Sequence, residues 1–172
     1  PLAAGERRHM GIPVASVLIT RGVRGESLLS FAKGRKNLPA KKRHAIARSL
    51  ARQVRAIHDA GVVHGSMYWR DILVQEPEQG DFSFVFLDPA HVRRFHIPGC
   101  RRLGYLRDLL DLAASAILLA SRCDRLRFYK IYYGKARLTF KDRVLLSVIG
   151  RLVRNRVKQE RHRMEVNSIF VA

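Results

Sequence analysis

The sequence is most specific at residues 64–74, which read His64-Gly65-Ser66-Met67-Tyr68-Trp69-Arg70-Asp71-Ile72-Leu73-Val74. The polar part of this stretch leads into a short apolar run, and a second apolar run at residues 82–87 ends at Asp88. Residues 76–81 separate the two runs and have the composition of a turn. The stretch therefore predicts a polar loop followed by a β-hairpin, with Asp71 just before the first strand and Asp88 ending the second.

A helix is expected directly before this loop. Pro39 is a residue favoured at the first helical position. Apolar residues then recur at three- and four-residue steps, as Ile46, Leu50 and Val54 do, until Gly61. This pattern predicts an amphipathic helix that delivers the chain to the loop.

Two shorter elements are expected nearer the N-terminus. Residues 2–10 resemble the end of a helix that Gly11 closes, with Pro13 just beyond it. Residues 14–20 are rich in β-branched side chains, which predicts a short buried strand.

The chain downstream of the hairpin is helical in pattern. Apolar stripes predict helices at residues 105–120, 126–133 and 141–152, with Gly134 and Gly150 as the weak points. With 47% hydrophobic residues, the chain has enough apolar material for one domain with a core. The fold class expected is α+β, mostly helical, with one small β-hairpin.

The chain is strongly basic. It has 33 Lys and Arg against 14 Asp and Glu, a formal net charge of +19, which attracts nucleic acid, anionic lipid or phosphorylated sugar. The run from Arg151 to Arg163 contains Glu160 as its single acid, so it is either a solvated helix face or an anion-binding segment. A nucleic-acid-binding protein is the weaker alternative, because the aromatic residues are not interleaved with the arginines.

The cysteines and the apolar runs limit where the protein works. Cys100 and Cys123 form neither a CxxC pair nor a metal-binding spacing, which indicates free thiols in a reducing compartment. The most apolar run, residues 109–120, falls short of the ~20 residues of a membrane-spanning helix, so any membrane contact is expected to be peripheral. The sequence begins at Pro1 with no signal-peptide pattern, and we expect a fragment or a processed chain.

The loop and hairpin have the layout of a kinase catalytic loop, H-x-D-x-x-x-x-N, followed by two strands of which the second ends in a metal-binding Asp. His64, Ser66 and Asp71 occupy the first, third and eighth positions. We therefore expect these three as catalytic residues, and Asp71 with Asp88 as magnesium ligands. The spacing suits phosphoryl transfer, because the acceptor hydroxyl and the metal that bridges the phosphates must meet in one cleft.

Four ordered blocks resemble the lipopolysaccharide kinase family (Kdo/WaaP, InaA-like), whose members have a protein-kinase-like fold. They are the loop at 64–72, the strand end at 87–94, the helix motif at 107–115 and the segment at 125–133. The resemblance implies use of ATP and Mg²⁺ to phosphorylate heptose or Kdo, the sugars of the lipopolysaccharide inner core. It also implies a cytoplasmic protein that is peripheral to the inner membrane.

Two departures from the kinase pattern concern catalysis. Ser66 stands where a kinase has its catalytic Asp, and the loss of a general base costs roughly 10²–10⁴ in rate. The sequence also contains no glycine-rich phosphate loop and no strand lysine paired with a helix glutamate before residue 64. A catalytically inactive pseudokinase or scaffold at the membrane surface is therefore the alternative function, and we expect this chain to fold but not to turn over ATP.

The expected domain organisation follows from the missing elements. Backbone groups of Thr20, Arg21, Gly22 and Val23 are expected to contact the adenine, as a kinase hinge does. The four expected segments are a remnant of the N-lobe at 1–20, the hinge and connection at 21–38, the kinase-like C-lobe at 39–160 and a basic tail at 161–172.

Several conspicuous side chains also have plainer interpretations. Tyr68 and Trp69 are expected to be packing or interface aromatics and not groups that stack on substrate. Phe128, Tyr132 and Tyr133 are expected to lie in the core. Asp108 and Asp111 lie three apart on one helix face, where one of them either braces the catalytic loop or pairs with Arg107 at the surface.

Overall fold

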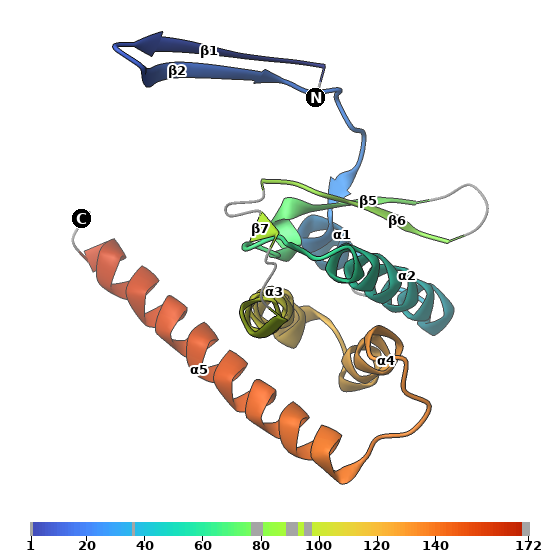
Figure 1. The fold of residues 1–172 in the computed structure, drawn as a ribbon. Coiled ribbons are helices and arrows are strands. Elements are labelled where there is room, and N and C mark those ends of the chain that lie inside the picture. The colour runs from blue at the N-terminus through green and yellow to red at the C-terminus, as the bar shows by residue number, and fades with distance from the viewer. Residues whose placement is uncertain (1, 36, 77–80, 89–92, 95–97, 170–172) are drawn as a thin grey trace.

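A body of helices and short strands carries an N-terminal hairpin that projects away from it (Figure 1). The structure is a computed structural model and describes residues 2–35, 37–76, 81–88, 93–94 and 98–169. Within these ranges, every helix is too short or too polar to cross a membrane.

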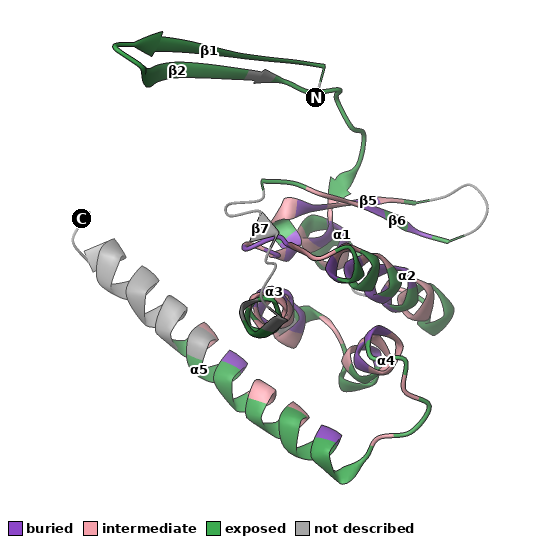
Figure 2. Cartoon of the chain, viewed as in Figure 1, coloured by how far each residue is buried: buried purple, intermediate pink, exposed green. Residues whose placement is uncertain are grey.

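The projecting hairpin consists of β1 (Ala3–His9) and β2 (Ile12–Ile19), paired antiparallel. The helix expected over residues 2–10 is wrong, because Met10 and Gly11 both have positive φ, +50° and +81°, and form a two-residue turn. The strand expected at 14–20 is confirmed, but it is not buried. All side chains described in β2 are exposed (Figure 2).

A short sheet and helix follow the hairpin. The strand β3 (Glu26–Ser27) pairs with β5 (Ile72–Gln75). Helix α1 (Leu28–Gly34) begins where the Ser27 hydroxyl accepts a hydrogen bond from the Ser30 amide at 3.1 Å. Leu28 and Phe31 of α1 are buried. This helix lies in the segment expected to be hinge and connection, and its seven residues are too short for a periodic pattern to be evident in the sequence.

The helix expected before the loop is confirmed as α2 (Ala40–Asp59), with Pro39 at its N-cap. Its buried face, which includes Leu50, Ala51 and Val54, continues to His58 at the C-terminal end. The helix packs along α4 (Arg122–Tyr132).

The expected hairpin is confirmed as β5 (Ile72–Gln75) and β6 (Ser83–Phe86), with Ile72 opposite Phe86. Together with β3 they form a sheet of order β3-β5-β6. A one-turn 3₁₀ helix, η1 (Trp69–Asp71), connects the loop to β5. The strand β4 (Val62–Val63) precedes the loop and pairs with β7 (Arg93–Arg94).

The C-terminal half is helical, as expected: α3 (Pro98–Leu119), α4 and α5 (Phe140–Ile169). The first of these begins earlier than residue 105, and α5 runs through Gly150 without a break and through most of the expected tail. Gly134 does follow the end of α4. In Figure 1, α3 lies between the β5–β6 hairpin and α5.

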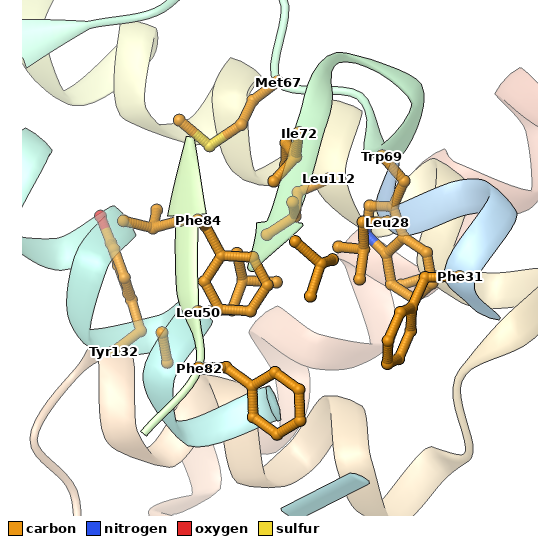
Figure 3. Packing of buried hydrophobic residues seen from close by; sticks show 14 residues of the cluster. Leu28, Phe31, Leu50, Met67, Trp69, Ile72, Phe82, Phe84, Leu112 and Tyr132 are labelled. Carbon is orange, nitrogen blue, oxygen red and sulfur yellow. The ribbon is translucent and has the colours of Figure 1, made fainter. Parts of the chain in front are cut away.

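One hydrophobic core joins α1, α2, α3, α4 and the β5–β6 hairpin (Figure 3). Met67 and Ile72, on either side of η1, are fully buried in it, and burial of such side chains stabilises a fold by about 1.5–3 kcal/mol each. Trp69 and Tyr132 are core residues and Phe128 packs against the core cluster, as expected, but Tyr133 is 40% exposed. Cys123 is an exposed free thiol, and the side chain of Cys100 lies outside the described part.

Candidate active site

A carboxylate of α3 holds the start of the loop at residues 64–71. Asp108 has no exposed surface, and its two oxygens accept hydrogen bonds from the backbone amides of His64, at 2.8 Å, and Gly65, at 2.7 Å. Both amides lie at the start of the loop, where no strand or helix can satisfy them. Of the two roles considered for the acids of this helix, the loop brace is confirmed for Asp108, and Arg107 is exposed.

A buried histidine holds this carboxylate in turn. His58, at the end of α2, lies 3.2 Å through Nε2 from Asp108 Oδ2 and 2.6 Å through Nδ1 from the Tyr132 hydroxyl. In the neutral ring, Nε2 then donates to the carboxylate and Nδ1 accepts from the tyrosine. Burial raises the pKa of the Tyr132 hydroxyl, so that it keeps the proton it donates. Tyr105 stacks on the ring, with centroids 4.2 Å apart, and donates to the His58 carbonyl.

The sequence analysis did not identify His58 as a site residue, although a signal was present. Leu50, Val54 and His58 recur every four residues, which places the histidine on the buried face of α2. A histidine on such a face needs polar partners. The partners are 50 and 74 residues away in sequence, at Asp108 and Tyr132.

The loop's own histidine is packed against the hairpin. His64 is buried, with its ring centroid 6.2 Å from that of Phe86 in an edge-on arrangement. Neither ring nitrogen has a hydrogen-bond partner among the described residues. Ser66, two residues on, is partly exposed. The catalytic roles expected for both residues stay predictions.

The two candidate metal ligands come to the same end of the hairpin. The Leu87 amide donates to the Asp71 carbonyl at 2.7 Å, which extends the β5–β6 pairing by one step, and Asp88 follows directly. The Asp71 side chain is 21% exposed and lies 3.3 Å from the guanidinium of Arg70. Asp88 is exposed and has a φ of +47°, a conformation that costs a non-glycine residue energy and is concentrated at functional sites.

This pair fits the requirements of magnesium. Carboxylate oxygens are its preferred protein ligands, and it usually needs only one or two of them because it keeps several waters and binds phosphate oxygens. Among the described residues, no group of three or more histidine, cysteine, aspartate or glutamate side chains could hold a metal ion. Binding of magnesium by Asp71 and Asp88, together with water and phosphate oxygens, stays a prediction.

Other acids that the sequence places near this region serve different purposes. Glu76 forms a hydrogen-bonded ion pair with Lys42 that holds its pKa below the usual value, and Asp81 lies 3.3 Å from Arg52. Both are exposed, and Asp59 pairs with Arg55 one turn earlier on α2. These three acids therefore form ion pairs with basic side chains at the surface.

The remaining expected site features are placed as follows. Trp69 is buried and its amide donates to the Ser115 hydroxyl at 3.3 Å, which confirms a packing role, while Tyr68 is partly exposed. Residues 20–23 form an exposed extended connection between β2 and β3, and their contact with adenine stays a prediction. Motif residues 89–92 lie outside the described part.

Comparisons with known proteins bear on the family and the fold of this chain. The sequence matches the model of the lipopolysaccharide kinase (Kdo/WaaP) family over residues 1–137. A comparison with curated proteins gave no match. Among solved structures, the chain is similar to that of WaaP in complex with acyl carrier protein, with a TM-score of 0.66 and 23% sequence identity. The similarity covers 88% of this chain and 66% of the WaaP chain, and it indicates a kinase-like fold. The chain therefore belongs to the lipopolysaccharide kinase (Kdo/WaaP) family.

Proposed function

We propose that this chain is the phosphate-transfer lobe of an ATP-dependent kinase that phosphorylates a heptose or Kdo sugar of the lipopolysaccharide inner core. The observation that supports the proposal is the clamp of Asp108, whose carboxylate holds the amides of His64 and Gly65 at the start of the loop, while Asp71 and Asp88 lie at the same end of the β5–β6 hairpin. A buried clamp on a polar loop maintains geometry, and phosphoryl transfer depends mainly on positioning and charge neutralisation.

Each residue has a distinct part in the proposed reaction. Asp71 and Asp88 would hold magnesium, which would supply neutralisation of phosphate charge. Ser66 aligns the acceptor hydroxyl but does not remove its proton, because a neutral serine hydroxyl is a poor base at neutral pH. His64 supports the loop by packing on Phe86. Backbone groups of residues 20–23 contact the adenine.

The sequence limits what this chain does by itself. It contains no glycine-rich phosphate loop, so the γ-phosphate is poorly aligned, and misplacement of about 1 Å costs ~10²-fold in rate. We expect weak magnesium-dependent ATP binding and no measurable turnover from the 172-residue chain. Because the sugar acceptor is part of a lipid, we infer that the protein works on the cytoplasmic side of the inner membrane as a peripheral protein.

Calorimetry with ATP and magnesium tests the nucleotide site. Asp88→Asn should abolish magnesium-dependent binding, and Asp81→Asn is the matched control, because it removes an exposed acid of the same hairpin that pairs only at the surface with Arg52. With a glycine-rich lobe supplied by fusion, Asp88→Asn should also abolish transfer of labelled γ-phosphate to a dephosphorylated core acceptor. Ser66→Ala should reduce that transfer much less.

The alternative function, a pseudokinase scaffold, is favoured by Ser66 and predicts a different result. ATP would bind without any dependence on magnesium, or not at all, and no fused lobe would restore transfer. Undiminished transfer by Asp88→Asn would show instead that the metal site lies elsewhere.

A further inference from the structure

Helix α5 has two apolar faces, of which only one is packed. The packed face includes Asp142 and Val153, which are buried, and the helix contacts α3. The second face carries large apolar side chains that are between 38% and 80% exposed. We call these residues the α5 stripe: Phe140, Val144, Leu145, Val148 and Leu152. Figure 2 shows most of the described part of α5 in the colour of exposed residues.

The spacing of the stripe makes it continuous. Phe140, Val144, Val148 and Leu152 are each four residues apart, so each is rotated by only about 40° from the one before, and the row extends for about 18 Å. Leu145 lies on the side of the row toward Leu152. A monomer normally exposes single apolar residues, whereas a row of this kind marks a surface that contacts something else.

The surface around the stripe is basic. Lys141, Arg143, Arg151, Arg154 and Lys158 are exposed along the same stretch of helix. Asp142 is the single acid between residues 140 and 158, and it is buried, with hydrogen bonds from Tyr129, Lys135 and Thr139. The described surface of this stretch therefore presents apolar and cationic groups and no acid.

We propose that the α5 stripe docks on an anionic lipid bilayer, with the helix parallel to the membrane and the stripe inserted among the headgroups. A helix with an apolar stripe flanked by Lys and Arg is the type that binds at this depth, through burial of the stripe and attraction to anionic lipid. A second copy of the chain is a poorer occupant, because each copy has a formal net charge of +19.

The docking orients the proposed active site. Helix α5 contacts α3, and its buried residue Val153 points away from the stripe. Because α3 carries the Asp108 clamp, a membrane-bound α5 would hold the catalytic loop one helix layer from the headgroups. The inference rests on the peripheral location proposed above and is independent of phosphotransfer. Vesicle binding and magnesium-dependent ATP binding are separate measurements, and either can fail alone.

Fluorescence of an inserted tryptophan tests the docking directly. The chain has one native tryptophan, Trp69, which is buried and gives a constant background. With phosphatidylglycerol vesicles, the fluorescence emission of Val148→Trp should shift to shorter wavelength and be quenched by brominated acyl chains. Both effects should be much smaller with phosphatidylcholine vesicles. Val17→Trp is the matched control, because Val17 is also an exposed valine but lies on β2.

Loss of binding tests the contribution of the stripe. Val148→Asp should weaken sedimentation with phosphatidylglycerol vesicles at least tenfold, while Val17→Asp should bind like the unaltered chain. Replacing Arg151, Arg154 and Lys158 with Gln should weaken binding by about five-fold for each charge near the surface. Circular dichroism should show unchanged helix content, since all these side chains are exposed.

Three results would overturn the proposal. One is equal binding of the unaltered chain to phosphatidylglycerol and phosphatidylcholine vesicles, and another is undiminished binding of Val148→Asp, which means that charge alone attracts the chain. The third is a spectral shift of Val148→Trp that appears without vesicles and grows with protein concentration, which assigns the stripe to a protein contact.

Discussion

Removal of the Asp108 carboxylate should be among the most damaging single changes in this protein. In Asp108→Ala, the buried amides of His64 and Gly65 lose their acceptor, and a buried polar group left without a partner costs about 1–3 kcal/mol. The two amides together give an expected loss of about 2–6 kcal/mol in the free energy of unfolding. That loss is a large part of the total stability of a domain, which is about 5–15 kcal/mol.

Asp108→Asn should cost roughly half as much. The side-chain oxygen of the new asparagine still accepts a hydrogen bond from one of the two backbone amides. Its NH₂ group faces the other backbone amide, and neither of these two donors can accept a hydrogen bond. Asp59→Asn is the control, since this exposed acid forms only a surface pair with Arg55, and its effect should stay within about 0.5 kcal/mol.

Urea unfolding measures these changes. The single tryptophan, Trp69, is buried within the loop, so its fluorescence reports the environment of the loop, while circular dichroism reports the helices. An Asp108→Ala chain that unfolds within about 0.5 kcal/mol of the unaltered chain would refute the clamp. If the tryptophan fluorescence changes at a lower urea concentration than the circular dichroism signal, the loop unfolds before the helices. That result would place the damage in the loop, where Asp108 forms its hydrogen bonds.

Two further changes test the packing around the site and its pH dependence. In Gly104→Ala the new methyl group would lie 2.5 Å from a methyl of Val63, so thermal unfolding should show destabilisation by about 1–3 kcal/mol. Adding Val63→Ala should recover part of that loss, and no recovery would contradict the close contact. Hydrogen bonds from Lys135 and Thr139 lower the pKa of Asp142 well below its usual value, so its contribution to stability is present above about pH 4 and is lost as the pH falls below that. Asp142→Asn should therefore flatten the fall in unfolding free energy between about pH 5 and pH 2, and an unchanged pH profile would exclude this role.

Local signals in the sequence were sufficient for much of the fold. The stripe of Ile46, Leu50 and Val54 predicted α2, and the two apolar runs around an acidic turn predicted the β5–β6 hairpin. Both are governed by interactions between residues that are near in sequence. The prediction is wrong at residues 2–10, where Gly11 has the sequence signature of a helix end but lies in a β-turn. Residues with positive φ, such as Met10 and Gly11, occur both in tight β-turns and at helix ends. The pairing of β1 with β2 is what makes this segment a hairpin.

The sequence by itself determined the order of His64, Ser66, Asp71 and Asp88, the break between loop and strands, and the family to which these belong. Only the tertiary structure decided which acid of α3 braces the loop, because Asp108 and Asp111 share a helix face and are both buried. The choice depends on which carboxylate meets the amides of His64 and Gly65, more than 40 residues away. Helical periodicity indicates that a side chain faces inward, but its partner is set by how α2, α3 and α4 pack together.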